Sequence, residues 1–282
     1  MRVRFARNDD RIKAAASTRL RSAEIDHPRS IMRCTLCIAA IGLVAMRPAQ
    51  AGHDTSPFGV EFSGCVESIG VALAPIASVL ALTAPGFIPV GLGGPVSPIV
   101  VRTADCTGIA VDGGKSKPGT VVQIGAVVVP PAPAGEDIDN YTFWYYTTSG
   151  ELARRLQDLG VEAQHVANID YTLHPGAAGT TNTLSVTVKR PGNPRFVLSG
   201  TVVPPSTPAG SFEAIWWQRT AAGNVRMDTS VPVIAIGSAS LGLVTDANGA
   251  LGALIGGGAL AFPILQQFNI LPHAQMSVDV AH

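Results

Sequence analysis

The feature that most constrains the fold is a succession of short apolar runs, rich in Val, Ile and Thr, which Gly, Pro and Asn interrupt. β-Branched residues favour strands, and these breakers favour turns. In one run Leu184, Val186 and Val188 alternate with polar residues, as in a strand with one solvated face. We predict strands at 58–63, 98–104, 107–112, 119–129, 140–147, 163–173, 182–190, 195–203, 212–218, 224–229, 233–244 and 275–281.

Few segments favour helix. The clearest is 149–159, whose leucines recur at helical spacing, with Thr148 as the expected N-cap and Gly160 as the C-terminal cap. Parts of 69–83 and 247–256 are the other two candidates. The pattern predicts a β-rich α+β fold, with a large antiparallel sheet or partly closed barrel and two or three packed helices.

The amino-terminal part has the pattern of a secretory signal. Residues 32–51 begin with Met and Arg, continue with an uncharged apolar run at 34–46, and end in Ala49-Gln50-Ala51, the small residues that a signal peptidase requires. Residues 1–31 are a basic, disordered leader, or they precede the true start at Met32. We therefore expect a single β-rich domain at 52–282 that is secreted or periplasmic.

Charge excludes two classes of partner. Residues 1–51 carry 10 of the 20 basic and 4 of the 20 acidic side chains, so 52–282 keeps 10 and 16 and has a net charge of −6. Such a domain lacks the basic surface that nucleic acid or anionic lipid requires. The uncharged stretches 68–101 and 247–278 contain too many Gly and Pro breakers for membrane-spanning helices, so we expect them to be buried helix and strand.

Two cysteines remain after the predicted cleavage, Cys65 and Cys106. An even pair in an oxidising compartment favours one disulfide, which would close a loop of about 40 residues and stabilise the fold by about 3–4 kcal/mol on the chain-entropy model. The alternative is two buried thiols.

The order of elements resembles the acetoacetate decarboxylase-like superfamily across most of 58–281. A helical segment leads into Leu82-Thr83-Ala84-Pro85-Gly86-Phe87-Ile88-Pro89, a Tyr141–Tyr146 strand feeds the 149–159 helix, and a Phe212–Trp217 strand precedes the Ala247–Gly256 helix. The resemblance implies a cone-shaped β-barrel with a few helices around an apolar cavity.

The catalytic lysine motif of that family is missing. The resemblance implies a catalytic lysine in a Gly-x-Pro-Lys-Lys-like motif. The nearest segment of this chain is Gly192-Asn193-Pro194-Arg195, which contains no lysine. The three lysines of the predicted domain, Lys115, Lys117 and Lys189, lie in a turn or at a strand end, and none has the buried cationic neighbour that activates an amine. Decarboxylation through a Schiff base is therefore not expected.

Other catalytic motifs are also missing from 52–282. There is no Gly-x-Ser-x-Gly elbow, phosphate loop or dinucleotide fingerprint, and no pair of histidines has metal-binding spacing, so we expect no cofactor and no metal. Four residues remain as acid/base candidates. Arg102 either reaches a solvated rim or faces a polar cavity, and Glu213 is either a general acid beside Trp216 and Trp217 or an exposed strand end. Asp170 and His174 share one face of a strand, which is either a site or a solvated surface.

Aromatic residues form the strongest local signal. Tyr141, Phe143 and Tyr145 should share one face of a strand and Trp144 the other, and Trp216 follows on a later strand. These side chains form either plain core or an aromatic-lined ligand pocket.

Three functions fit these features. The first is an exported protein that binds a small apolar or carbonyl-containing molecule. The second is an acetoacetate decarboxylase-like enzyme, a lyase, isomerase or hydrolase, which needs two acid/base side chains at one reacting position. The third is a cell-surface interaction protein.

Overall fold

The computed structural model describes residues 54–132, 138–176, 181–189 and 195–281. The predicted leader (1–31), the signal segment (32–51) and Gly192–Pro194 lie outside these residues. The strands are β1 (Phe58–Pro75), β2 (Ile88–Pro89), β3 (Val96–Val111), β4 (Lys117–Val129), β5 (Ile138–Thr147), β6 (Ala163–His165), β7 (Ile169–His174), β8 (Asn182–Val188), β9 (Phe196–Val203), β10 (Gly210–Thr220), β11 (Gly223–Thr245), β12 (Ala259–Ala261) and β13 (Leu265–Ala281). The helices are α1 (Ile76–Leu82), α2 (Gly150–Asp158) and α3 (Ala250–Ile255).

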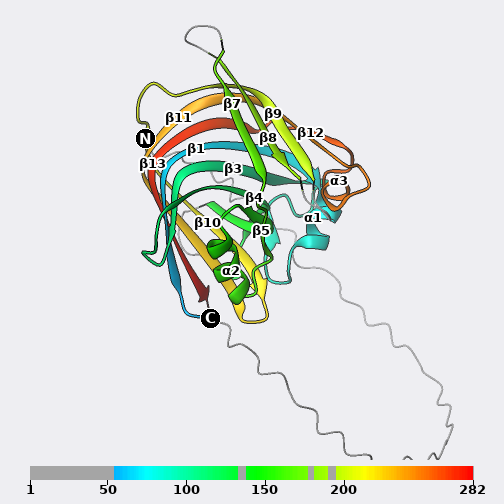
Figure 1. Cartoon of the computed structure of the whole chain (residues 1–282). Helices are drawn as coiled ribbons and strands as arrows, with labels where there is room; N and C mark the ends of the chain where they lie inside the picture. Colours follow the sequence, from blue (N-terminus) through cyan, green and yellow to red (C-terminus); the bar gives the residue numbers. More distant parts are fainter. Residues whose placement is uncertain (1–53, 133–137, 177–180, 190–194, 282) are drawn as a thin grey trace, which may run out of the picture. The chain divides into compact units, whose positions relative to one another are not determined.

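The strands form one large sheet that closes partly on itself (Figure 1). Its order runs β10-β5-β4-β3-β1-β13-β11-β9-β8-β7, and β10 also pairs with β11, so that seven strands form a ring. β11 makes this possible because its first part pairs with β10 and its last part pairs with β9. Neighbouring strands are antiparallel except for β5 with β10 and β5 with β6. The predicted β-rich α+β class with a partly closed barrel is confirmed.

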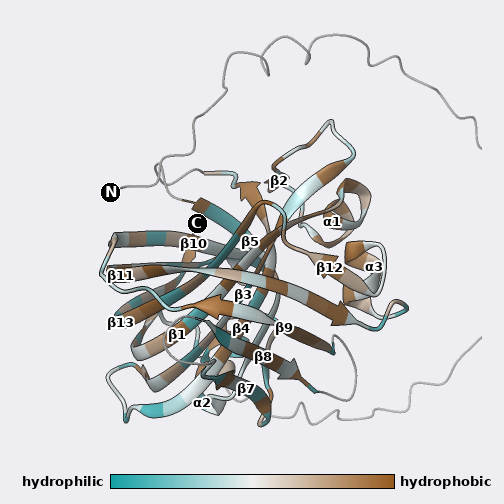
Figure 2. Ribbon diagram, turned by 90° about the horizontal axis from the view of Figure 1, so that it is seen from above, coloured by the Kyte–Doolittle hydropathy of each residue, from teal (hydrophilic) through white to brown (hydrophobic). Residues whose placement is uncertain are grey.

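Two hydrophobic cores lie on opposite faces of this sheet. The first, which we call the ring core, draws side chains from all seven ring strands and from α2 and the residues after it. The second draws side chains from the other face of the same strands, from β7, β8 and β9, and from α1 and α3. Figure 2 shows α1 and α3 beside each other, and the Ser78 hydroxyl on α1 donates to the carbonyl of Ala253 on α3 at 3.1 Å. None of the helices in the described ranges is long and apolar enough to cross a membrane.

The predicted elements exist, but several boundaries differ. The two strands predicted at 98–104 and 107–112 are one strand, β3, and those at 224–229 and 233–244 are one strand, β11. Most of 69–75 is strand, because β3 and β13 pair with both of its edges. Helix α2 is capped by Ser149, whose hydroxyl accepts from the Leu152 amide at 3.3 Å.

The predicted disulfide is present. Cys65 and Cys106 lie directly opposite each other on β1 and β3, with their α-carbons 4.0 Å apart. Both side chains are buried in the ring core. The bond therefore ties two central ring strands together.

Along four ring strands the alternation of inward and outward side chains is interrupted, and the interruptions lie next to one another in the sheet. We call this interruption the phase reversal. On β1 the side chains of Phe58, Val60 and Phe62 point into the ring core, and the next one to do so is Cys65. The alternation shifts by one residue because Gly64, with φ +56°, has a left-handed backbone conformation. The same reversal occurs on β3 between residues 106 and 109, on β13 between 271 and 274, and on β11 between 231 and 234. These breaks lie side by side, since Ser63 pairs with both residue 108 of β3 and residue 273 of β13.

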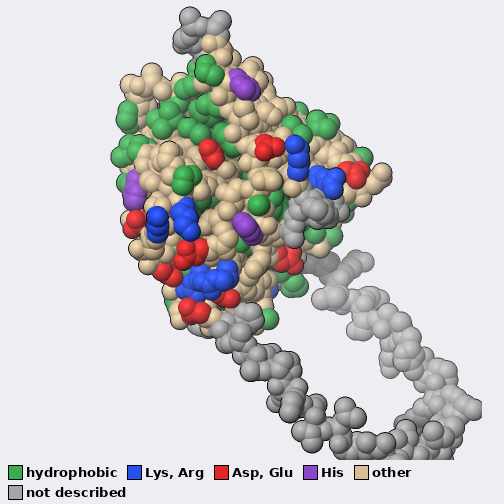
Figure 3. Space-filling model, viewed as in Figure 1, with side chains coloured by type: hydrophobic (Ala, Val, Ile, Leu, Met, Phe, Trp, Pro, Cys, Tyr) green, Lys and Arg blue, Asp and Glu red, His purple; other side chains and the backbone are tan. Residues whose placement is uncertain are grey.

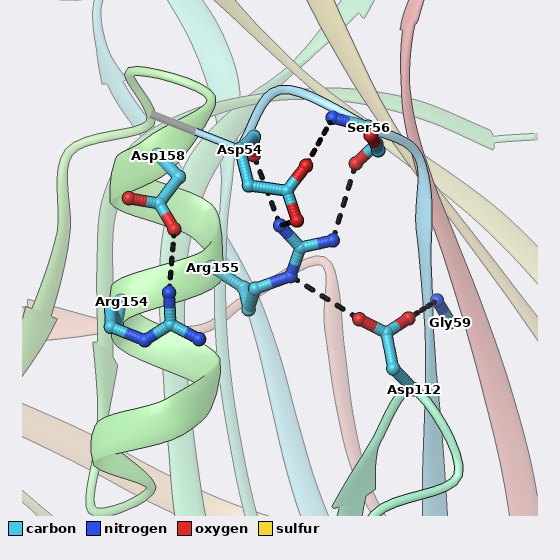
Figure 4. Close-up of polar contacts among 7 residues, drawn as sticks. All are labelled: Asp54, Ser56, Gly59, Asp112, Arg154, Arg155 and Asp158. Atoms are coloured by element: carbon cyan, nitrogen blue, oxygen red, sulfur yellow. Dashed lines mark hydrogen bonds and ion pairs between the residues drawn. The ribbon is translucent and has the colours of Figure 1, made fainter. Parts of the chain in front are cut away.

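The buried side chain of Arg155 on α2 binds the start of the described chain (Figure 4). Its Nη1 lies 2.8 Å from Oδ2 of Asp54 and donates to the Asp54 carbonyl at 3.0 Å. Its Nε lies 3.3 Å from Oδ2 of Asp112, and its guanidinium lies 4.8 Å from the centre of the Phe58 ring. Hydrogen bonds from Ser56, together with Arg155, hold the pKa of Asp54 below its ordinary value. These contacts fix residues 54–58 against the ring.

We predict that Gly64→Ala lowers the free energy of unfolding by about 2 kcal/mol, because an L side chain is strained at this φ. An added β-carbon would also lie 2.4 Å from the Thr107 hydroxyl oxygen. Urea unfolding measures the loss. Gly59→Ala on the same strand is the matched control, because its β-carbon meets nothing within 4 Å, and it should stay within about 0.5 kcal/mol of the wild type. Equal effects of the two variants would contradict this explanation.

Candidate functional site

A buried ion pair lies inside the ring. The Arg102 Nε on β3 is 2.5 Å from Oε1 of Glu67 on β1, and the two side chains are only 13% and 3% exposed. The other carboxylate oxygen of Glu67 accepts from Nδ2 of Asn269 on β13 at 3.0 Å. Because removing two charges from water is costly, such a pair is weak evidence of a purely stabilising role.

The strand register explains why the side chain of Glu67 contacts both Arg102 and Asn269. Glu67 lies directly opposite Asn269 across the β1–β13 ladder, and Arg102 lies opposite Ile69, two residues further along β1. Glu67 faces inward because the phase reversal at Gly64 precedes it. Without that reversal Glu67 would share the outer face with the exposed Glu61.

Polar groups continue across the next two ring strands. Gln123 of β4 lies opposite Arg102, and Tyr145 of β5 lies opposite Gln123. The Gln123 side-chain amide donates to the Thr142 hydroxyl at 3.1 Å. A row of polar side chains therefore crosses five neighbouring strands within the ring core.

A cavity of about 30 Å³ adjoins the ion pair. Its walls include Glu67, Ile69, Arg102, Phe212, Trp216 and Thr229. A buried water needs roughly 10–15 Å³ of such space, so the cavity has room for about two waters. It combines one charged edge with an apolar, aromatic wall.

Three fully buried polar atoms near this row have no hydrogen-bond partner among the described residues. They are the Tyr145 hydroxyl, the Thr229 hydroxyl and Oδ1 of Asn269. Leaving a buried donor or acceptor unpaired costs about 1–3 kcal/mol, so each requires an explanation. Burial raises the pKa of Tyr145, although Arg102 opposes the rise, and the phenol therefore stays protonated and can donate a hydrogen bond.

The structure brings two of the sequence candidates together at this cavity, Arg102 and Trp216. Of the two interpretations of Arg102, the polar interior is the one observed. Tyr145 lies in the same ring core.

The other predicted aromatic residues lie on the opposite face. Tyr141 and Phe143 belong to the second core and Trp144 packs against it, so the predicted alternation with Tyr145 is interrupted. The cause is a β-bulge, where the β4–β5 register shifts next to Gly125. A β-carbon on Gly125 would lie 2.1 Å from the Tyr141 carbonyl oxygen, which shows how closely the strands approach there.

The remaining acid/base candidates do not converge. Glu213 is exposed on β10, in an open groove that Asp228 also lines. Asp170 and His174 are exposed on β7, where Asp170 pairs with Lys189 at 3.2 Å. The two-residue acid/base site that an enzyme requires is therefore not formed by these residues and Arg102.

Sequence analysis missed Glu67, Gln123 and Asn269. Glu67 lies outside the strand predicted at 58–63, and simple alternation continued from the outward-facing Glu61 would assign both to one side. The available signal was Gly64, the residue that most readily adopts a left-handed conformation and reverses the alternation.

The electrostatic surroundings are mixed. On the face drawn in Figure 3, acidic and basic side chains are interspersed. In the described ranges no group of three His, Cys, Asp or Glu side chains is arranged to hold a metal ion. Lys115, Lys117 and Lys189 are all exposed, so none of them reaches the ring core.

The chain is similar in fold to solved structures of acetoacetate decarboxylase-like proteins. An acetoacetate decarboxylase-like enzyme from Sphingomonas wittichii RW1 matches with a TM-score of 0.49 and 12% identity, over 86% of this chain and 98% of that one. Acetoacetate decarboxylase from Legionella pneumophila matches with a TM-score of 0.46 and 9% identity, over 80% of this chain and 86% of that one. The enduracididine biosynthesis enzyme MppR, complexed with pyruvate, matches with a TM-score of 0.48 and 11% identity, over 79% of this chain and 88% of that one.

No protein-family model and no curated protein matches the sequence. The likeness to the solved structures is one of fold, and at these TM-scores it says nothing of the reaction or ligand of this chain.

We predict that Glu67→Gln lowers the free energy of unfolding by about 3–5 kcal/mol, because it leaves the Arg102 charge buried without its partner. Chemical denaturation measures the loss. Removing both charges, in Glu67→Gln with Arg102→Met, should cost less than the single change. Glu213→Gln removes an exposed carboxylate and should change stability by no more than about 0.5 kcal/mol. A Glu67→Gln variant as stable as Glu213→Gln would show that the ion pair does not form.

Proposed function

We propose that the ring interior binds a small molecule carrying a carbonyl or carboxylate group, beside the Glu67–Arg102 pair. The supporting observation is the cavity wall itself, which brings the charged Glu67 and Arg102 side chains together with the Thr229 hydroxyl, a buried group without a partner among the described residues. The Thr229 hydroxyl can donate to a ligand oxygen. Arg102 uses its Nε on Glu67, and its fork of donors suits a carboxylate.

Glu67 is the acid/base group of this proposal. It is a carboxylate on the cavity wall, and Asn269 orients it through one oxygen. It can accept a proton from a carbon next to a bound carbonyl, and a donor such as Arg102 or Thr229 then stabilises the developing oxyanion. The proton returns to carbon or to solvent, so the step needs no oxidant and no lysine. Among the three functions considered, this supports an enzyme more than a purely apolar binder.

The cavity of about 30 Å³ holds about two waters, so a larger ligand enters only when the cavity walls move apart. Ile69, Phe212 and Trp216 close its apolar side, which suits a methyl group next to the carbonyl. Pyruvate is larger than two waters, so its binding requires the cavity walls to move apart; it is the chosen probe because it carries a carboxylate, a ketone and a methyl group.

We predict that the protein exchanges the methyl protons of pyruvate for deuterium in heavy water, faster than buffer alone, as followed by proton NMR. Glu67→Gln with Arg102→Met should abolish the exchange, and Thr229→Val should weaken pyruvate binding about tenfold, equivalent to about 1.4 kcal/mol. Glu213→Gln, which removes a carboxylate outside the ring, should leave both unchanged. Exchange that survives loss of both interior charges would exclude Glu67 as the base, and absence of pyruvate binding by calorimetry would exclude the ligand class.

We also propose that the protein is exported and cleaved after Ala51. Two observations support this. The disulfide Cys65–Cys106 is of a kind that persists in oxidising compartments. In addition, Arg155 fixes the chain from Asp54 onward, just beyond the predicted cleavage position.

Expression in a bacterial host tests the export. We expect amino-terminal sequencing of the periplasmic fraction to begin at Gly52, and Ala51→Arg, which places a large charged side chain at the cleavage position, to block processing. An intact amino terminus on a cytoplasmic protein with free thiols would overturn this proposal.

A further inference from the structure

One end of the sheet carries an unusual number of exposed large aliphatic side chains. They include Leu73, Leu80, Ile88, Val90, Leu92 and Val129, each at least 40% exposed. We call these six residues the apolar end. All but Val129 belong to the stretch 68–101, which contains no charged residue.

The segments that carry the apolar end are neighbours in the fold, because their backbones are hydrogen-bonded to one another. The backbone amide of Val90 donates to the carbonyl of Val127 at 2.9 Å, and Ile88 pairs with Val129. The amide of Ile76, which opens α1, donates to the carbonyl of Pro95 at 3.0 Å. Helix α1 thereby lies against β1, β2 and β3 at this end.

The chain around β2 shows the clearest signal. Ile88, Val90 and Leu92 recur at every second residue and are 48%, 40% and 57% exposed, whereas the intervening Pro89 and the preceding Phe87 are buried. β2 pairs with β4 on one side only. A short strand with a free edge and an outward aliphatic row is a typical pairing surface.

We propose that the apolar end is the contact between two copies of this chain, related by a two-fold axis. A two-fold contact places a patch against itself, so any charge in the patch meets a like charge. The absence of Asp, Glu, Lys and Arg from 68–101 removes this repulsion.

The exposed area of the apolar end is smaller than one side of a standard interface but of the same order. The six side chains expose on the order of 500 Å², before the Gly and Pro residues between them are counted, and a standard interface buries about 800 Å² on each partner. The largest apolar patch of a monomer covers about 300–600 Å² and often has a function. An anionic membrane is a poorer occupant, because the patch offers no Lys or Arg to its headgroups.

Sedimentation velocity of the expressed protein over a concentration series tests the proposal. We expect a dimer for the wild type and a monomer for Ile88→Lys with Leu92→Lys, and likewise for Ile88→Glu with Leu92→Glu. Mixing the lysine and glutamate variants should restore a dimer, because opposite charges then face each other. Val233→Lys is the matched control, since Val233 is 44% exposed on β11 outside the apolar end, and it should remain dimeric.

Three outcomes would overturn the proposal. They are a wild type that stays monomeric at about 100 µM, charged variants that still dimerise, and a dimer that the mixed variants fail to restore. Binding of the monomer to neutral lipid vesicles, lost in the charged variants, would assign the surface to a membrane instead. Circular dichroism of each variant shows that it is folded.

Discussion

The interior of this protein depends on the phase reversal, the place in four neighbouring strands where the alternation of inward and outward side chains shifts by one residue. At this place Gly64 shifts the alternation on β1, and β3, β13 and β11 follow at the same level. On the side of the reversal that holds Phe58, Val60 and Phe62, hydrophobic side chains fill the ring. On the other side, the shifted alternation turns Glu67, Arg102 and Asn269 inward. The polar site therefore exists because of a backbone conformation that glycine adopts easily.

The energetic cost of this arrangement points to function. Folding must desolvate a carboxylate and a guanidinium and leave three buried polar atoms without a partner in the described residues. Apolar side chains of similar size would often serve stability equally well. The disulfide next to the phase reversal holds β1 and β3 together where the charged partners face each other, and so offsets part of the cost.

The sequence predicted the fold class and the disulfide well, because the first follows from local composition and the second from the even pair of cysteines left in 52–282. It predicted the site poorly. Arg102 was recognised since a charge in an apolar strand is conspicuous, whereas Glu67 lies outside every predicted strand and Asn269 lies in a stretch predicted only as buried helix and strand. The β-bulge beside Gly125 likewise moved Tyr141 and Phe143 away from Tyr145. Alternation describes one regular strand, and each irregularity reverses everything after it.

The most direct test of this account is an atomic-resolution crystal structure of the protein grown with pyruvate. We expect Glu67 and Arg102 in contact inside the ring, with ordered non-protein density within hydrogen-bonding distance of Arg102 and Thr229. A ring interior filled by apolar side chains, with Glu67 turned to the outer face, would contradict the account.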